Sequence, residues 1–328
     1  MVPGLVRFVS GVFSVLCETY LNPYSEYRMP KPLRTLMSLA FLFLGLGACS
    51  EKEEEDPQPE PAPQPVVVKC RLLKEEVVSP NPGQTHTREY FYSGFQLATV
   101  EDVYPSNTAL TSTIAFGVEA NDRIASTTIV RNGSVFQYYL FEHNAEGLIS
   151  RVDLHTRPSG PGSQPVKTGT REHTYNTKKQ LVSSKNYQVT GGTPRLLNDF
   201  TFTYNDKGNL TAVREYRIFN YQSNGTYNDI VINTTYTHDD KRNPYHEYSY
   251  QNYLPPGLLI PNMSPNNILT VTSRTTTEGT TYGPGSTFDT APLNFTGTNT
   301  YTYTANNLPA KVTGSQGVTR TFTYECEK

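Results

Sequence analysis

The chain has 328 residues and a formal net charge of −2, so it lacks the basic excess with which proteins bind nucleic acid. It contains 23 Tyr, 15 Phe and no Trp, and Thr is plentiful, whereas helix-forming Ala, Leu and Met are scarce beyond residue 65. This composition favours half-buried β-strands over helices, and the length suits one large all-β domain or two smaller ones.

Residues 29–48 have the layout of a secretory signal. Two cations, Lys31 and Arg34, precede an apolar run, and small residues follow that run. The run is too short to span a bilayer comfortably as a helix. We therefore expect this segment to direct export of the protein.

The residues that close this signal, Leu46-Gly47-Ala48-Cys49, resemble the lipobox of bacterial lipoproteins. The resemblance implies cleavage before Cys49 and lipidation of that cysteine, which would anchor the protein in a membrane. Residues 1–28 are then expected to be a non-native upstream extension, which would arise from a start codon assigned too early. The rival lipidation site, Cys17, follows Val15-Leu16, which lacks the small side chains that a signal peptidase pocket requires.

Residues 49–65 are expected to form a tether. Glu51–Asp56 holds five acids and one lysine, and Pro57–Pro65 has proline at every second position. This spacing favours an extended polyproline conformation, so the tether would hold the domain ~45 Å from the bilayer. An acidic run after the lipidated cysteine resembles the signal that displays Bacteroidetes lipoproteins on the outer face of the outer membrane. A solvated spacer has the same charge pattern.

Residues 66–328 are expected to form the folded domain, with Cys70 and Cys326 near its two ends. In an oxidising compartment these cysteines are candidates for a disulfide worth ~5 kcal/mol, although two unrelated buried thiols also fit. A flat sheet of about twelve strands would hold its ends ~50 Å apart, too far for a bond. A bonded pair therefore requires a closed or strongly curled sheet.

A recurring frame runs through this domain. It consists of an aromatic residue, any residue, a second aromatic residue and Asn or Asp, followed by a few polar residues and then Leu or Ile. The second ring position falls at Tyr92, Val118, His143, Tyr175, Tyr204, His238 and Tyr303. Steps of 25 to 34 residues, with one double-length step after His238, indicate a stacked or meandering array.

The clearest copy of the frame, Phe202–Leu210, predicts a β-hairpin. From Phe200 to Tyr204 aromatic residues alternate with threonine, so rings and hydroxyls occupy opposite faces of a strand. Residues 205–209, Asn-Asp-Lys-Gly-Asn, favour a bend. The sequence thus predicts an all-β domain in which about a dozen antiparallel strands form consecutive hairpins.

Residues 202–216, FTYNDKGNLTAVREY, resemble the YD repeat of Rhs-type proteins (Tyr-Asx-x-x-Gly-x-Leu). Residues 70–328 as a whole resemble the YD-repeat-like lipoproteins of the Bacteroidetes. The resemblance implies an array of β-hairpins on a lipid anchor. The chain has too few copies of the repeat to enclose a toxin domain, so the shell function of full Rhs proteins does not carry over.

Residues 205–209 are also a conceivable cation site. A calcium loop needs several converging carboxylates or carbonyls, whereas this segment has one acid, Asp206, beside Lys207. His143 and His238 occupy ring positions of the frame, which favours packing over metal binding, and no zinc-type spacing occurs. We therefore expect a turn at 205–209 and neither a metal nor another cofactor.

No nucleophile elbow or phosphate-binding glycine loop appears, so we expect a protein without enzymatic activity. Binding is expected at long insertions between strands. Three Pro/Gly-rich insertions occupy residues 157–167, 253–267 and 282–292. Tyr248, Tyr250 and Tyr253 lie beside the second insertion, where they would stack on sugar rings.

The sequence thus predicts a lipoprotein of the outer membrane, exposed on the outer face, with a binding or scaffolding role. Its expected partners are the membrane, through the lipid, and a glycan or an envelope protein. The alternatives are a secreted hydrolase that acts on polysaccharide and a purely structural envelope component. Carboxylates that converge in a cleft would favour the hydrolase, and an aromatic platform would favour binding.

Overall fold

The computed structural model describes residues 68–94, 96–119, 123–158, 163–190, 193–219, 228–246, 263–276 and 294–327. Cys49, the tether and the predicted domain start at residue 66 lie outside these ranges, and so do Tyr248, Tyr250 and Tyr253. Within the described ranges, no helix is long and apolar enough to cross a membrane.

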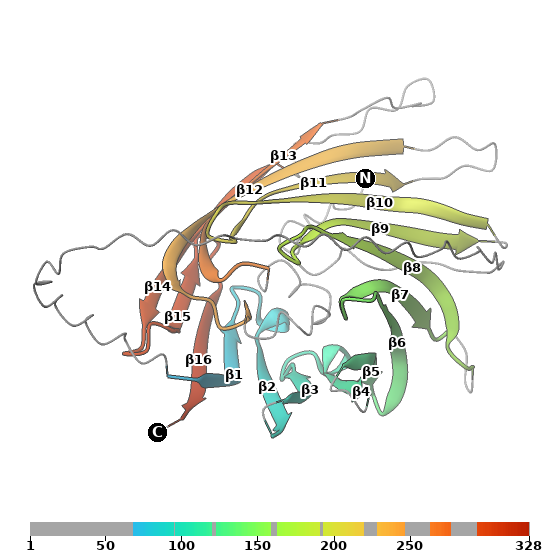
Figure 1. Cartoon of the computed structure of the whole chain (residues 1–328). Coiled ribbons are helices and arrows are strands. Elements are labelled where there is room, and N and C mark those ends of the chain that lie inside the picture. The colour runs from blue at the N-terminus through green and yellow to red at the C-terminus, as the bar shows by residue number, and fades with distance from the viewer. Residues whose placement is uncertain are drawn as a thin grey trace, which may run out of the picture. The chain divides into compact units, whose positions relative to one another are not determined.

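In the described part of the chain, sixteen β-strands form one closed barrel (Figure 1). The strands are β1 (Cys70–Val78), β2 (His86–Ser93), β3 (Gln96–Val103), β4 (Ser112–Val118), β5 (Ile124–Arg131), β6 (Ser134–His143), β7 (Ile149–Thr156), β8 (Val166–Tyr175), β9 (Leu181–Thr190), β10 (Thr193–Tyr204), β11 (Leu210–Phe219), β12 (Asn228–Arg242), β13 (Asn266–Thr276), β14 (Phe295–Tyr303), β15 (Pro309–Gly314) and β16 (Thr319–Cys326). Two 3-10 helices, η1 (Pro82–Gln84) and η2 (Thr108–Leu110), follow β1 and β3.

Each strand pairs antiparallel with its neighbours in chain order, and β16 pairs with β1 to close the sheet. The predicted all-β meander of hairpins is therefore confirmed, in its closed form. The strands number sixteen rather than about a dozen, because each copy of the frame contributes two strands and an eighth copy exists at the chain ends.

All seven predicted second ring positions occupy the same structural position. Each lies at a register shift, where it pairs with the residue that re-enters the sheet after the turn. The pairs are Tyr92 with Leu97, Val118 with Ile124, His143 with Ile149, Tyr175 with Leu181, Tyr204 with Leu210, His238 with Ile268 and Tyr303 with Pro309. The antiparallel order brings these turns to one end of the barrel, the base, and the other connections to the opposite end, the mouth.

Residues 205–209 form a turn at the base, as predicted. The Oδ1 atom of Asn205 accepts a hydrogen bond from the Asn209 N–H (3.0 Å), and Gly208 has a φ of 84°, a left-handed conformation that glycine adopts without strain. Asn144 and Asn176 accept in the same way from the N–H four residues on, at 2.9 Å. The frame's asparagine therefore shapes the turn through its side chain.

Tyrosines at the base join each hairpin to the preceding one. In four hairpins, the phenol at the second ring position donates to the backbone carbonyl of the preceding hairpin's re-entry residue. The pairs are Tyr92 with Leu72, Tyr175 with Ile149, Tyr204 with Leu181 and Tyr324 with Pro309, at 2.6–2.8 Å. We call this set of bonds the tyrosine ladder. A buried phenol needs such a partner, so the ladder fixes neighbouring hairpins against each other.

The eighth copy of the frame is divided between the two ends of the chain. Phe322 and Tyr324 on β16 supply the rings, and Leu72 on β1 pairs with Tyr324 as the re-entry residue, next to a register shift. In place of a turn, Cys70 and Cys326 form a disulfide (S–S 2.06 Å). The bond joins the two cysteines that the sequence singles out, and it closes the last hairpin covalently.

Side chains alternate between a buried inner wall and an exposed outer wall. On β14 the tyrosines are half-buried, while Thr296, Thr298, Thr300 and Thr302 are exposed. Rings and aliphatic side chains of the inner wall form the hydrophobic core. Tyr245, from the connection after β12, packs into this core against Phe322, so the residues that directly follow β12 contribute to the interior of the barrel.

Candidate functional site

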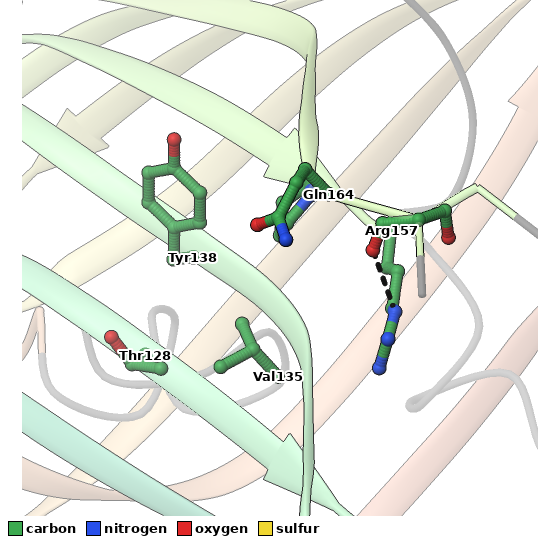
Figure 2. A pocket seen from close by; sticks show the side chains of 7 residues that line it. Thr128, Val135, Tyr138, Arg157 and Gln164 are labelled. Carbon is green, nitrogen blue, oxygen red and sulfur yellow. Dashed lines mark hydrogen bonds between the residues drawn. The ribbon is translucent and has the colours of Figure 1, made fainter. Parts of the chain in front are cut away.

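A pocket of about 470 Å³ opens on the outer wall near the mouth (Figure 2), which is within the usual size range of small-molecule sites. It is lined by Thr128, Val135, Tyr138, Arg157, Ser163, Gln164 and Pro165. These residues belong to β5, β6 and the β7–β8 connection. That connection is the first of the three insertions that the sequence predicts as binding loops.

The β5–β6 hairpin positions one wall of the pocket. Its turn residues, Asn132 and Gly133, both have positive φ (49° and 67°), the two-residue geometry that matches the twist of paired strands. Across the hairpin, Thr128 pairs with Tyr138. The Tyr138 ring stacks on His155 of β7, with centroids 4.2 Å and planes 9° apart. The stack holds the tyrosine ring in one orientation.

Arg157 organises the opposite wall. Its backbone N–H donates to the Phe136 carbonyl (3.1 Å), and its Nε donates to the Ser163 carbonyl (2.9 Å). The Ser163 hydroxyl in turn donates to the Pro158 carbonyl (2.7 Å). Figure 2 shows the Gln164 amide directed toward the side of the pocket where Tyr138 stands. The two described ends of the connection are therefore tied to each other and to β6.

The pocket lining suits a ring-shaped polar ligand. The Tyr138 ring and the Val135 and Pro165 side chains are apolar, whereas Thr128 and Gln164 provide a hydroxyl and an amide. A sugar ring has the matching character, an apolar face and an edge of hydroxyls. Burial lowers the pKa of His155, so the imidazole stacked on Tyr138 is neutral at pH 7. No carboxylate is among the lining residues.

Charged residues also gather on the inner wall. Glu75 is fully buried and accepts hydrogen bonds from the Tyr90 phenol and from Arg320 (3.1 Å). Arg88 donates two hydrogen bonds to Asp102, at 2.5 and 2.8 Å. Burial, together with the charge of Glu75, raises the pKa of Tyr90, so its phenol remains a donor. Each carboxylate has an arginine partner, an arrangement that suits a structural role.

The structure describes some of the predicted site residues and not others. Cys70 and Cys326 meet at the base, whereas Cys49 and the three candidate tyrosines lie outside the described residues. Tyr245, just before those tyrosines, is 8% exposed and belongs to the core rather than to a surface platform. In the described ranges, no three His, Cys, Asp or Glu side chains gather as metal ligands.

Sequence reasoning missed most of the pocket. Thr128, Val135 and Tyr138 are strand residues of ordinary type, and only their register brings them together on the outer wall. The sequence signals that bear on the site are the length of the Arg157–Lys167 insertion and the Asn132-Gly133 hairpin turn, and only the insertion was singled out.

No protein-family model matches the chain, and no curated protein matches it either. Among solved structures, it is similar to a porin-like protein from Bacteroides uniformis (15% identity, TM-score 0.45, covering 78% of this chain and 98% of that one). It is similar to another porin-like protein, from Bacteroides vulgatus (9% identity, TM-score 0.47, covering 78% of this chain and 99% of that one). It is also similar to a chain in the crystal structure of TcdB2-TccC3-Cdc42 (11% identity, TM-score 0.22, covering 70% of this chain and 12% of that one). These likenesses do not bear on activity.

Proposed function

We propose that this protein is a lipid-anchored barrel of the cell surface that binds a saccharide in the outer-wall pocket without cleaving it. The observation that carries the proposal is the pocket lining. A fixed Tyr138 ring, backed by His155, offers an aromatic face, and the Gln164 amide and Thr128 hydroxyl stand around it. Apolar rings with a few placed polar groups are typical of small-ligand sites.

The outer wall supports attachment by lipid rather than insertion of the barrel. Exposed threonines follow one another along β14, and ion pairs such as Lys185–Asp199 and Arg71–Glu325 lie on the same wall. A barrel that spans a bilayer presents an apolar band about 25 Å tall, and an Arg or Lys at its midplane costs about 2–4 kcal/mol. We therefore place the barrel outside the bilayer, held by a lipid on Cys49.

The route of the chain suggests how the barrel is presented. Strand β1 starts at the base, where the Arg242 guanidinium donates to the Val68 carbonyl (2.8 Å) and the Glu327 N–H donates to the Lys69 carbonyl (2.9 Å). The first described residues of the chain therefore lie at the base. The pocket lies near the mouth, so an anchored barrel would present the pocket away from the membrane.

A hydrolase is the second candidate, and the observation that favours it is the pair of buried carboxylates, Glu75 and Asp102. Glycoside hydrolysis requires one protonated and one ionised carboxyl group beside the substrate. Here each carboxylate already accepts hydrogen bonds from an arginine, and neither lines the pocket. Binding without cleavage is therefore the better-supported function.

A glycan array probed with the purified full-length chain tests the proposal. We expect retention of at least one class of saccharide and a loss of about ten-fold or more for Tyr138→Ala, since stacking on an aromatic ring contributes one to a few kcal/mol. Tyr187→Ala, which removes an outer-wall tyrosine of β9 outside the pocket, should bind like the wild type. No retention on the array would contradict saccharide binding, and release of sugar from any polysaccharide would favour the hydrolase.

Phase separation in a mild detergent tests the mode of attachment. The wild type should enter the detergent phase through its lipid, whereas a chain that starts at residue 50, and so lacks both the apolar signal and Cys49, should remain in the aqueous phase. Recovery of that shortened chain in the detergent phase would show that the barrel itself enters lipid and would contradict the proposal.

A further inference from the structure

The pocket contains a positive charge that a neutral sugar would leave unused. In the described part of the chain, the Arg157 side chain makes one hydrogen bond, from Nε to the Ser163 carbonyl (2.9 Å), and no ion pair. It is half-buried and is the single charged residue of the lining. A half-buried charge without a counter-charge gains energy from a bound anion.

The bond to Ser163 also orients the guanidinium. A guanidinium has five N–H donors in a rigid fork, of which this bond uses one. The Nη donors remain for a ligand, and two of them can bind the two oxygens of a carboxylate side by side. A flexible lysine at this position would offer charge without that fixed geometry.

The acid on the strand that precedes Arg157 already has partners. The one acid of β7, Asp153, is bound by Lys167 (2.6 Å) and by Arg151 (3.1 Å). It is therefore not the counter-charge of Arg157.

We propose that the pocket recognises an acidic saccharide, in which a sugar ring that bears a carboxylate rests on Tyr138 and its carboxylate binds Arg157. The inference rests on the proposed saccharide-binding function and narrows its ligand class. Thr128 and Gln164 then serve the ring hydroxyls, and the charge separates acidic from neutral sugars of the same shape.

The test compares a galacturonic acid trisaccharide with its fully methyl-esterified form, which has the same rings and hydroxyls but no charge. Calorimetric titration of the full-length chain at about 50 mM salt should show the acid binding about ten-fold more tightly than the ester. At about 500 mM salt the preference should shrink, because salt screens the charge interaction.

Variants assign the preference to one side chain. Arg157→Gln should bind the acid and the ester with equal affinity, and Arg157→Lys should keep part of the preference for the acid. Arg71→Gln, which removes an outer-wall arginine at the base, is the matched control and should keep all of it. Thermal unfolding checks that Arg157→Gln remains folded. If Arg157→Gln is unfolded, a reduced preference for the acid in Arg157→Lys is the test of the role of the Arg157 guanidinium.

Three results would overturn the inference, and they separate it from the proposal on which it rests. If the ester binds in a Tyr138-dependent manner but the acid binds no more tightly, the acidic ligand class is wrong while saccharide binding stands. If the acid is preferred and the preference survives in Arg157→Gln, the role assigned to Arg157 is wrong. If the chain binds neither form at concentrations up to about 10 mM, a Kd beyond which specific recognition is negligible, the inference is wrong, and the glycan array decides separately whether saccharide binding is wrong as well.

Discussion

The base and the mouth of the barrel use the same strands in different ways. At the base, each hairpin repeats a ring, a re-entry residue and a bulge, and the tyrosine ladder links neighbouring hairpins. Toward the mouth, the inner wall has charge pairs that each occur once, such as Glu75–Arg320 and Glu215–Arg217. The repeated elements build and close the wall, and the pocket lies among the elements that do not repeat.

This difference separates two sources of stability. Contacts at the base are local and repeat from hairpin to hairpin, so the loss of one should have a similar cost all around the barrel. Charge pairs on the inner wall depend on a specific partner, so the cost of losing one depends on whether that partner is left buried. The predictions that follow test this distinction.

The largest effect is expected at the one hairpin that has no turn. Replacing both cysteines (Cys70→Ser with Cys326→Ser) removes the bond that spans 256 residues of sequence and should lower the free energy of unfolding by about 5 kcal/mol. Urea titration of both forms measures the change. The control is the wild type with its disulfide reduced, which should match the double variant; equal stability of oxidised wild type and double variant would mean that strand pairing alone closes the barrel.

A smaller effect is expected for a charge pair whose carboxylate is fully buried. Glu75→Gln keeps the shape of that side chain but leaves Arg320, which is 38% exposed, without its counter-charge, and it should cost about 2 kcal/mol. Glu76→Gln, the next residue on the same strand, loses an exposed pair with Lys74 and should cost less than about 1 kcal/mol. Equal costs for the two variants would remove the distinction between inner and outer wall.

His173 should make stability depend on pH. It occupies the first ring position of its hairpin, where burial lowers its pKa to about 3. Because the unfolded chain binds this proton near pH 6.5 and the folded chain does not, stability should fall as pH drops from about 6.5 toward 3, by up to about 1.4 kcal/mol per pH unit. His173→Phe introduces the residue type that the next hairpin has at the same position, Phe202. In this variant the fall in stability between pH 6.5 and 3 that His173 causes should vanish. A slope unchanged by the substitution would show that other groups cause it.

The base could be predicted from the sequence because its signal is repeated. Seven second ring positions, including the non-aromatic Val118, were found by spacing, and all seven lie at register shifts. The eighth copy of the frame is not predicted by the spacing, because its halves stand at opposite ends of the chain and a disulfide replaces the polar turn residues. For the same reason the number of strands was underestimated.

The pocket could not be predicted in the same way. Alternation tells which residues share a face, but it does not tell which neighbouring strands bring Thr128, Tyr138 and His155 together. The sequence predicts Tyr248, Tyr250 and Tyr253 as a binding platform because they cluster beside an insertion. Tyr245, close before them, is part of the core, which shows that tyrosine in this chain serves the interior as readily as a surface.

The smallest effect tests the tyrosine ladder itself. Burial raises the pKa of Tyr204, so its phenol stays protonated and donates to the Leu181 carbonyl (2.8 Å) across the usual pH range. Tyr204→Phe keeps the ring but leaves that carbonyl without its donor, and it should lower the free energy of unfolding by about 1 kcal/mol.

Tyr138→Phe makes the same chemical change on the outer wall near the mouth and should leave stability within about 0.5 kcal/mol of the wild type. If both variants were neutral, the ring alone would explain why tyrosine recurs in the frame, and phenylalanine would serve equally well. A cost confined to Tyr204→Phe would instead identify the hydroxyl as the reason, because the Tyr204 phenol joins its hairpin to the preceding one through the Leu181 carbonyl.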